Sequence, residues 1–201
     1  MTKLLLVNNY NNSARERFMR LVSSMRRLGV GVQSSDAAQV KPEGFKNFDG
    51  IVLSGSYDML SRSATQTKYG KEIELIREAT TPVLGVCFGH QMIAIAFGAR
   101  VVPSPKPVLG HYKAKILRPD PLFKGLGGSI TIYESHHEVV DAVPLGFEQL
   151  ATSSGSEICA MRSPKKPVYG VQFHPERSSR ENPDGDRFLG NFVSAVRTGL
   201  R

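Results

Sequence analysis

Cysteine and long apolar runs are both scarce in this sequence of 201 residues. The two cysteines, Cys87 and Cys159, are too few for a disulfide framework, which favours a reducing, cytoplasmic setting. The sequence has no run of 18 apolar residues, so we expect no transmembrane helix. The apolar run over 4–7 is too short for the core of a signal peptide, and we interpret it as a first strand.

Patterns that hold metals or link domains are missing as well. No cluster of cysteines and histidines has zinc spacing, so we predict no metal site. The sequence contains no internal repeat and no low-complexity linker. We therefore predict one domain over residues 1–201 that works without a cofactor.

Acidic residues are outnumbered by basic ones, with 18 Asp and Glu against 26 Lys and Arg and a formal net charge of +8. A charge of this sign raises the question of a nucleic-acid partner. However, the basic residues are scattered along the chain and are not interleaved with aromatic residues. We therefore expect no nucleic-acid binding, and we predict a basic surface that meets a protein partner or an anionic substrate.

Apolar strands alternate with amphipathic helices through the first half of the chain. We predict strands over 4–7, 30–33, 49–55 and 82–86, and helical segments over 11–29 (capped by Ser13), 68–80 and 90–98. Short strands separated by turn residues then follow between 111 and 173, before a closing helix over 186–196. This order predicts an α/β fold with a parallel core and an antiparallel extension, and functional sites at the carboxyl ends of the strands.

The segment Gly85-Val86-Cys87-Phe88-Gly89 has the form G-x-C-x-G between a predicted strand and a predicted helix. This context is typical of a nucleophile elbow, where small residues let the strand and the helix pack closely. The amino terminus of the helix would favour a thiolate on Cys87, and the Phe88 N–H would be placed to donate to an oxyanion. The alternative is that Cys87 is one more buried core cysteine.

A thiolate nucleophile needs a base, and the chain has five histidines. His90 lies on the helix of the cysteine itself and is interpreted as structural, whereas residues 136–137 end a strand and can face the site. His174 ends the predicted strand over 167–173, and Glu176 can receive its second ring N–H. Alone, this pair could be a strand-end turn with a solvated glutamate. Together with the elbow cysteine, it favours a Cys-His-Glu triad.

At these residues the sequence resembles the class I (triad) glutamine amidotransferases. "GVCFGHQ" over 85–91 resembles the nucleophile motif of that family, "GVQFHPE" over 170–176 its histidine and glutamate motif, and "IVLSGS" over 51–56 its oxyanion strand. The resemblance covers essentially the whole chain. It implies a flavodoxin-like three-layer α/β/α domain with a mostly parallel central sheet and an antiparallel extension, which hydrolyses L-glutamine to glutamate and ammonia through a thioester on Cys87.

The resemblance also implies roles for individual residues. Cys87 would be the nucleophile, His174 the general base and acid, and Glu176 the group that orients the histidine. The oxyanion hole would be formed by the backbone N–H groups of Phe88 and Ser56. Ser56 stands where the family usually has glycine, and a glycine-type backbone conformation there would cost energy. The residues implied to bind substrate are Gln91, Ser135, His136 and His137.

Within the family, the second half of the chain most resembles the glutaminase subunits of GMP synthetases, followed by the small subunits of anthranilate and aminodeoxychorismate synthases. The sequence has no GxxxxGK[ST] loop, so we expect the ammonia acceptor to be handled by a separate synthetase subunit. His137 and Glu138 stand where GMP synthetase glutaminases usually have an aspartate of the coupling surface, and we predict that they couple the site to this partner. A stand-alone γ-glutamyl hydrolase and a non-enzymatic regulatory subunit remain alternatives.

Overall fold

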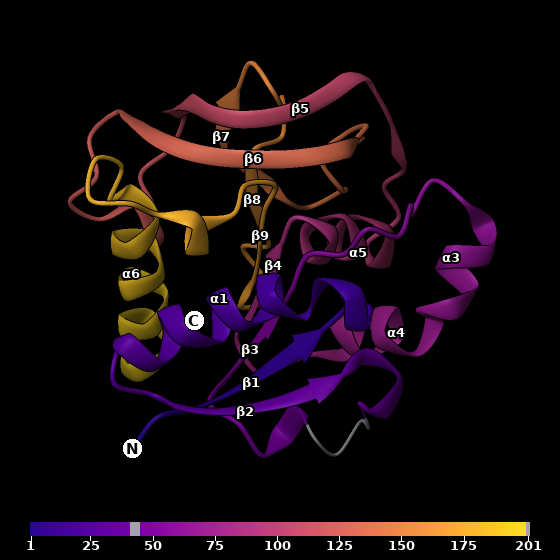
Figure 1. Cartoon of the computed structure of the whole chain (residues 1–201), viewed down its shortest axis with the longest axis horizontal. Helices are drawn as coiled ribbons and strands as arrows, with labels where there is room; N and C mark the ends of the chain where they lie inside the picture. Colours follow the sequence, from indigo (N-terminus) through magenta and orange to yellow (C-terminus); the bar gives the residue numbers. More distant parts are fainter. Residues whose placement is uncertain (41–44, 200–201) are drawn as a thin grey trace.

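A central sheet runs through the computed structural model, which describes residues 1–40 and 45–199 (Figure 1). Within these residues the sheet has nine strands in the order β2-β1-β3-β4-β9-β8-β7-β5-β6. The first five in this order are parallel to one another. They are β1 (Lys3–Asn8), β2 (Gly31–Asp36), β3 (Gly50–Leu53), β4 (Val83–Val86) and β9 (Val168–Val171). Their order is that of flavodoxin-like folds, in which β1 lies at the switch point.

The rest of the sheet is antiparallel, from the pairing of β8 with β9 out to the edge strand β6. These strands are β5 (Val101–Ile116), β6 (Ser129–Val140), β7 (Glu148–Ser153) and β8 (Ala160–Arg162). The backbone N–H of His174, just past β9, donates to the carbonyl oxygen of Tyr133 on β6 at 2.8 Å. The antiparallel extension therefore reaches back over the carboxyl end of the parallel strands.

Helices cover both faces of the parallel strands (Figure 1). Helices α1 (Arg15–Arg27) and α6 (Asp184–Thr198) pack on one face through Phe18, Leu21, Phe188 and Phe192. Helices α4 (Gly70–Glu78) and α5 (Phe88–Ala96) pack on the other, and α3 (Ser63–Lys68) precedes α4. Because the strands are covered on both sides, β3, β4 and β9 are buried along their whole length and read as continuous apolar runs. The predicted three-layer α/β/α class is confirmed.

Two local predictions were wrong. Ser13 does not cap α1: it lies in a short 3-10 turn (Asn12–Ala14), and the residue at the cap position is Ala14, with no side-chain hydrogen bond to the helix. Strand β5 begins ten residues earlier than expected, at Val101, although this stretch contains three prolines. The pairing of β5 with β6 shifts register between Pro103 and Val108, so the prolines fall at a bulge, where their missing N–H groups are tolerated.

No helix in residues 1–40 or 45–199 is long and apolar enough to cross a membrane.

Candidate active site

Cys87 lies in the sharp turn between β4 and α5, at the amino-terminal cap of the helix. Its φ of 53° and ψ of −100° make it the one non-glycine residue with positive φ in the part of the chain that the structure describes. Its backbone N–H donates to the Val171 carbonyl oxygen on β9 at 2.8 Å, which fixes the turn against the neighbouring strand. A non-glycine residue in this rare backbone conformation is typical of functional sites and of the nucleophile elbow.

The two flanking glycines are explained by the close approach of α5 to the sheet. A Cβ at Gly85 would overlap the backbone carbonyl of Gly89 and lie 2.7 Å from the His90 nitrogen. A Cβ at Gly89 would lie 2.7 Å from the Leu53 carbonyl oxygen on β3. Any larger residue at either position would push the helix away from the strands and would move Cys87 with it.

Replacing Gly85 with alanine should therefore damage both stability and the elbow. Because backbone rather than a flexible side chain blocks the new methyl group, we expect a loss of about 1–3 kcal/mol in the free energy of unfolding, measured by urea denaturation. Gly128→Ala is the matched control, since a Cβ there meets no atom within 4 Å. Equal stability of the two variants would contradict this account of the turn.

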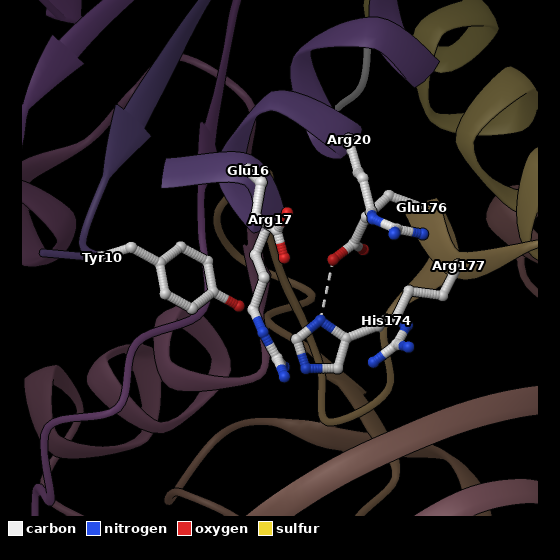
Figure 2. A pocket seen from close by; sticks show the side chains of 7 residues that line it. All are labelled: Tyr10, Glu16, Arg17, Arg20, His174, Glu176 and Arg177. Carbon is white, nitrogen blue, oxygen red and sulfur yellow. Dashed lines mark hydrogen bonds and ion pairs between the residues drawn. The ribbon is translucent and has the colours of Figure 1, made fainter. Parts of the chain in front are cut away.

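His174 and Glu176 follow β9 and form a buried pair (Figure 2). The Nδ1 atom of His174 lies 2.8 Å from the Glu176 Oε1 atom, and both side chains are almost fully shielded from solvent, with 3% and 5% exposed. Burial of the ring disfavours its charged form, but the Glu176 carboxylate and Cys87 outweigh this effect and raise the pKa of His174 to about 10. At neutral pH the histidine is therefore an imidazolium.

Gln172 lies beside the sulfur of Cys87, although sequence reasoning gave it no role. Its side chain is fully buried, and its Nε2 atom donates to the Cys87 Sγ atom at 3.6 Å. Gln91 donates to the Gln172 Oε1 atom at 3.3 Å and to the Glu138 carbonyl oxygen at 2.9 Å. The alternation of side chains along a strand could have identified Gln172. Residues two apart on an extended chain point to the same side, and His174 is two residues further on.

The segment 135–137 of β6 crosses the site next to the cysteine. Cys87 Sγ lies 3.8 Å from the Ser135 carbonyl oxygen. His136 is buried, and its Nε2 atom lies 2.8 Å from the Glu134 Oε2 atom, whereas His137 is exposed. The structure therefore brings the predicted substrate-binding residues of β6 to the sulfur.

Glu138 is buried and holds the loop that follows β3. Its carboxylate accepts hydrogen bonds from the backbone N–H groups of Leu60, at 2.6 Å, and Ser61, at 3.0 Å. The same loop, residues 54–61, carries Ser56. Glu138 therefore does not project freely at the mouth of the site, and any coupling through it would act on the 54–61 loop.

Ser56 adopts no left-handed conformation, so the expected cost of replacing a glycine does not arise. Its hydroxyl accepts a hydrogen bond from the Asp58 N–H at 3.1 Å, which shapes the loop. The position in this loop that requires a glycine is Gly55, because Tyr10 and His174 pack against its backbone. A Cβ there would overlap the Tyr10 hydroxyl and lie 3.1 Å from the His174 Cε1 atom. Burial raises the pKa of Tyr10, so this hydroxyl stays neutral beside the histidine.

Two other residues that the sequence singled out lie in the interior. His90 is fully buried, and burial lowers its pKa to about 3, so it is neutral and packs against β9 at Gly170. Cys159 has no exposed surface and lies in the core near Glu134 and Ser153, where burial raises the pKa of its thiol. Cys87, in contrast, lines a pocket.

One pocket gathers residues that are far apart in the chain. Cys87 and Gln91 come from the elbow, His174 from the end of β9, residues 135–138 from β6, and residues 56–59 from the loop after β3; Tyr10 and Arg17 from the amino-terminal part of the chain complete the lining. A thiol and an imidazole in one pocket, at the cap of a helix, are suited to nucleophilic attack on an amide carbonyl.

Known proteins resemble the chain along most of its length. Residues 6–196 match the family model described as glutamine amidotransferase class-I. The glutamine-hydrolyzing GMP synthase subunit of Methanosarcina barkeri is 35% identical over 193 residues, covering 95% of both chains. The protein of the same name from Pyrococcus abyssi is 36% identical over 167 residues, covering 82% of this chain and 86% of the relative. A crystal structure from Thermoplasma acidophilum, described as that of a GMP synthase subunit, superposes with a TM-score of 0.86 at 28% identity, over 98% and 95% of the two chains.

Proposed function

Because this chain belongs to the class I glutamine amidotransferases, we propose that it hydrolyses L-glutamine with Cys87, His174 and Glu176 as its catalytic triad. We propose further that it is the glutaminase subunit of a GMP synthase, as its relatives from Methanosarcina barkeri and Pyrococcus abyssi are named. The observation that carries the triad is the strained cysteine at the helix cap beside a buried histidine–glutamate pair. The chain would act as a single amidotransferase domain in the cytoplasm, in keeping with its two free thiols.

In the acylation half of the reaction, the Cys87 sulfur attacks the γ-carboxamide carbon of glutamine. The carbonyl oxygen becomes an oxyanion, which the N–H groups of Phe88 and Ser56 stabilise. His174 gives its proton to the leaving nitrogen, so that ammonia departs and a γ-glutamyl thioester remains on the sulfur. The imidazolium of His174 is ready for this proton transfer because Glu176 holds its other ring nitrogen.

In the second half, His174 takes a proton from water as the water oxygen attacks the thioester carbon. The carbon–sulfur bond breaks, and glutamate leaves with the oxygen of the water. The sulfur and the histidine return to their starting charges, so one glutamine and one water yield one glutamate and one ammonia. The hydrogen bond from Gln172 Nε2 would stabilise negative charge on the Cys87 sulfur in the free enzyme.

Substrate recognition would use the segments around the cysteine. The backbone of Ser135, His136 and His137 would hold the α-amino and α-carboxylate groups of glutamine, because this part of β6 lies beside the sulfur. Both hydrogen bonds that the Gln91 side chain donates use its Nε2 atom, so its Oε1 atom is assigned to the amide of the substrate. Through the 54–61 loop, Glu138 and its exposed neighbour His137 would couple the site to the synthetase that receives the ammonia.

Covalent labelling tests this function. A diazoketone analogue of glutamine should alkylate Cys87 and spare Cys159, and free glutamine should slow the labelling. Peptide mapping by mass spectrometry identifies the modified thiol. The purified chain should also release glutamate and ammonia in equal amounts, and the synthetase subunit of a GMP synthase should raise this activity about tenfold or more. Labelling of Cys159 alone would exclude the assigned nucleophile, and rapid turnover of γ-glutamyl peptides in place of glutamine would indicate a stand-alone hydrolase.

A further inference from the structure

Three arginines surround the outer side of the histidine–glutamate pair (Figure 2). Arg17 and Arg20 extend from α1, and Arg177 from the turn after His174. Together with Tyr10, Glu16, His174 and Glu176 they line one pocket next to the one that contains Cys87. Figure 2 shows the guanidinium groups of Arg17 and Arg177 on opposite sides of the His174 ring.

The carboxylates in this pocket do not balance its arginines. The lining contains two carboxylates, Glu16 and Glu176, against three guanidinium groups, and Glu176 Oε1 is bonded to His174. Among the residues that the structure describes, none of the three guanidinium groups forms an ion pair. Arg177 instead stacks on the Tyr133 ring, with 3.8 Å between the guanidinium carbon and the ring centroid. Like charges brought together in this way repel one another, so the cluster is suited to an anion that arrives from outside the chain.

The size of the pocket selects among anions. Its volume of about 60 Å³ is far below the 300–1,000 Å³ typical of sites for drug-sized molecules, which argues against a nucleotide. A side-chain carboxylate is small enough, and the planar guanidinium group matches it with two parallel hydrogen bonds. An acidic segment of a protein therefore fits the cluster in both size and charge.

The cluster also contacts the loop that carries the proposed oxyanion donor. Arg17 lies over the Tyr57 ring, with 5.0 Å between the guanidinium carbon and the ring centroid. Tyr57, which is 55% exposed, packs edge-on against Tyr10 at a centroid distance of 5.9 Å. Because Tyr57 directly follows Ser56, a movement of Arg17 toward a bound carboxylate would change the packing beside the Ser56 N–H.

We propose that Arg17, Arg20 and Arg177 receive an acidic segment of the synthetase subunit, and that Arg17 transmits its docking to the 54–61 loop through Tyr57. This inference rests on the proposed function, since it assumes a synthetase partner. It adds the surface that the partner contacts, the chemistry of the contacting group, and a route from that contact to the site.

Charge reversal on α1 tests the docking surface. The probe is the purified synthetase subunit of the GMP synthase from the same source, and its Kd is measured by calorimetry. Arg20→Glu should raise the Kd about tenfold or more, and raising the salt concentration should weaken the native complex. Arg26→Glu is the matched control, because Arg26 is an exposed arginine of the same helix that lines no described pocket. Equal Kd values for the two variants would overturn the proposal. Arg20→Gln replaces Arg20→Glu if the latter melts at a lower temperature than the native chain.

Competition and coupling are measured on the same proteins. A decaglutamate peptide should displace the synthetase, and tripolyphosphate added to the same total concentration of negative charge should not; the reverse order would assign the cluster to phosphate and overturn the proposal. In Arg17→Ala, the ratio of synthetase-stimulated to basal glutaminase activity should fall about fivefold or more. An unchanged ratio would remove Arg17 from the coupling route.

If the native chain is labelled at Cys87 and stimulated by the synthetase while Arg20→Glu behaves as Arg26→Glu does, the docking surface alone fails. If the native chain is neither labelled nor stimulated, the proposed function fails.

Discussion

Replacing Cys87 with alanine should lower glutamine turnover by about 10⁴-fold or more, because no other thiol reaches the pocket in the described part of the chain. The fold should survive, since the change removes one sulfur atom and a φ of 53° is no harder for alanine than for cysteine. Steady-state release of glutamate measures the activity, and thermal melting measures the fold.

Cys159→Ala provides the opposite control. This thiol is fully buried in the core, so its loss should cost about 1 kcal/mol of stability while kcat/KM stays close to that of the native chain. Cys87→Ala should therefore lose activity and keep its stability, whereas Cys159→Ala should lose some stability and keep its activity. Substantial glutaminase activity in Cys87→Ala would disprove the thioester mechanism.

His174→Ala should be about as damaging as Cys87→Ala, because the members of the proposed triad should act as a unit, so that their losses do not add. Glu176→Gln should retain more activity, since the amide can still accept the ring N–H that Glu176 now receives. It should also change the pH profile. Without the carboxylate, the effect of burial is less well opposed, and the pKa of His174 falls from about 10. The imidazolium is then lost at a lower pH, so the alkaline limb of the kcat/KM profile shifts to lower pH.

The pH profile separates an electrostatic role of Glu176 from a purely structural one. A variant that only loosened the turn after β9 would lose rate at every pH and leave the alkaline limb in place. If Glu176→Gln proved less active than His174→Ala, the assigned order of roles would be wrong.

The residues that sequence reasoning found were those whose chemistry depends on local pattern. The glycines at 85 and 89 mark the elbow by their spacing around Cys87. The contact that Gly85 allows is made within one turn of chain, between β4 and α5, whereas Gly89 makes room for Leu53 on β3. His174 and Glu176 are two residues apart, so their pairing also needs no knowledge of the fold. Gln172, which sequence reasoning missed, contacts a residue far away in the chain, Cys87. For Glu138 the sequence predicted a coupling role but not its contact, because the backbone at 60–61 is also distant in the chain.

The same distinction explains one of the two errors in secondary structure. A run of prolines argues against a strand unless its bulge against β6 is known, and that bulge is set by a partner strand more than 20 residues away. Ser13 is a good capping residue by type, but the chain enters α1 through a 3-10 turn that shifts the cap to Ala14. For β5, pairing with a distant strand decided between two locally reasonable conformations, whereas the turn before α1 is closed locally by the Ala14 N–H and the Asn11 carbonyl oxygen.

The placement of the proposed nucleophile and its proposed base after neighbouring strands has a consequence for how the protein matures. Cys87 and His174 are 87 residues apart in the chain (174 − 87), and all the antiparallel strands are inserted between β4 and β9. Closing a loop of this length costs entropy that only the final pairing offsets, and such distant pairings form slowly. The proposed nucleophile is therefore synthesised long before its proposed base, and we expect no hydrolysis until β9 has docked beside β4. Recovery of glutaminase activity during refolding should thus report the completion of this distant strand pairing.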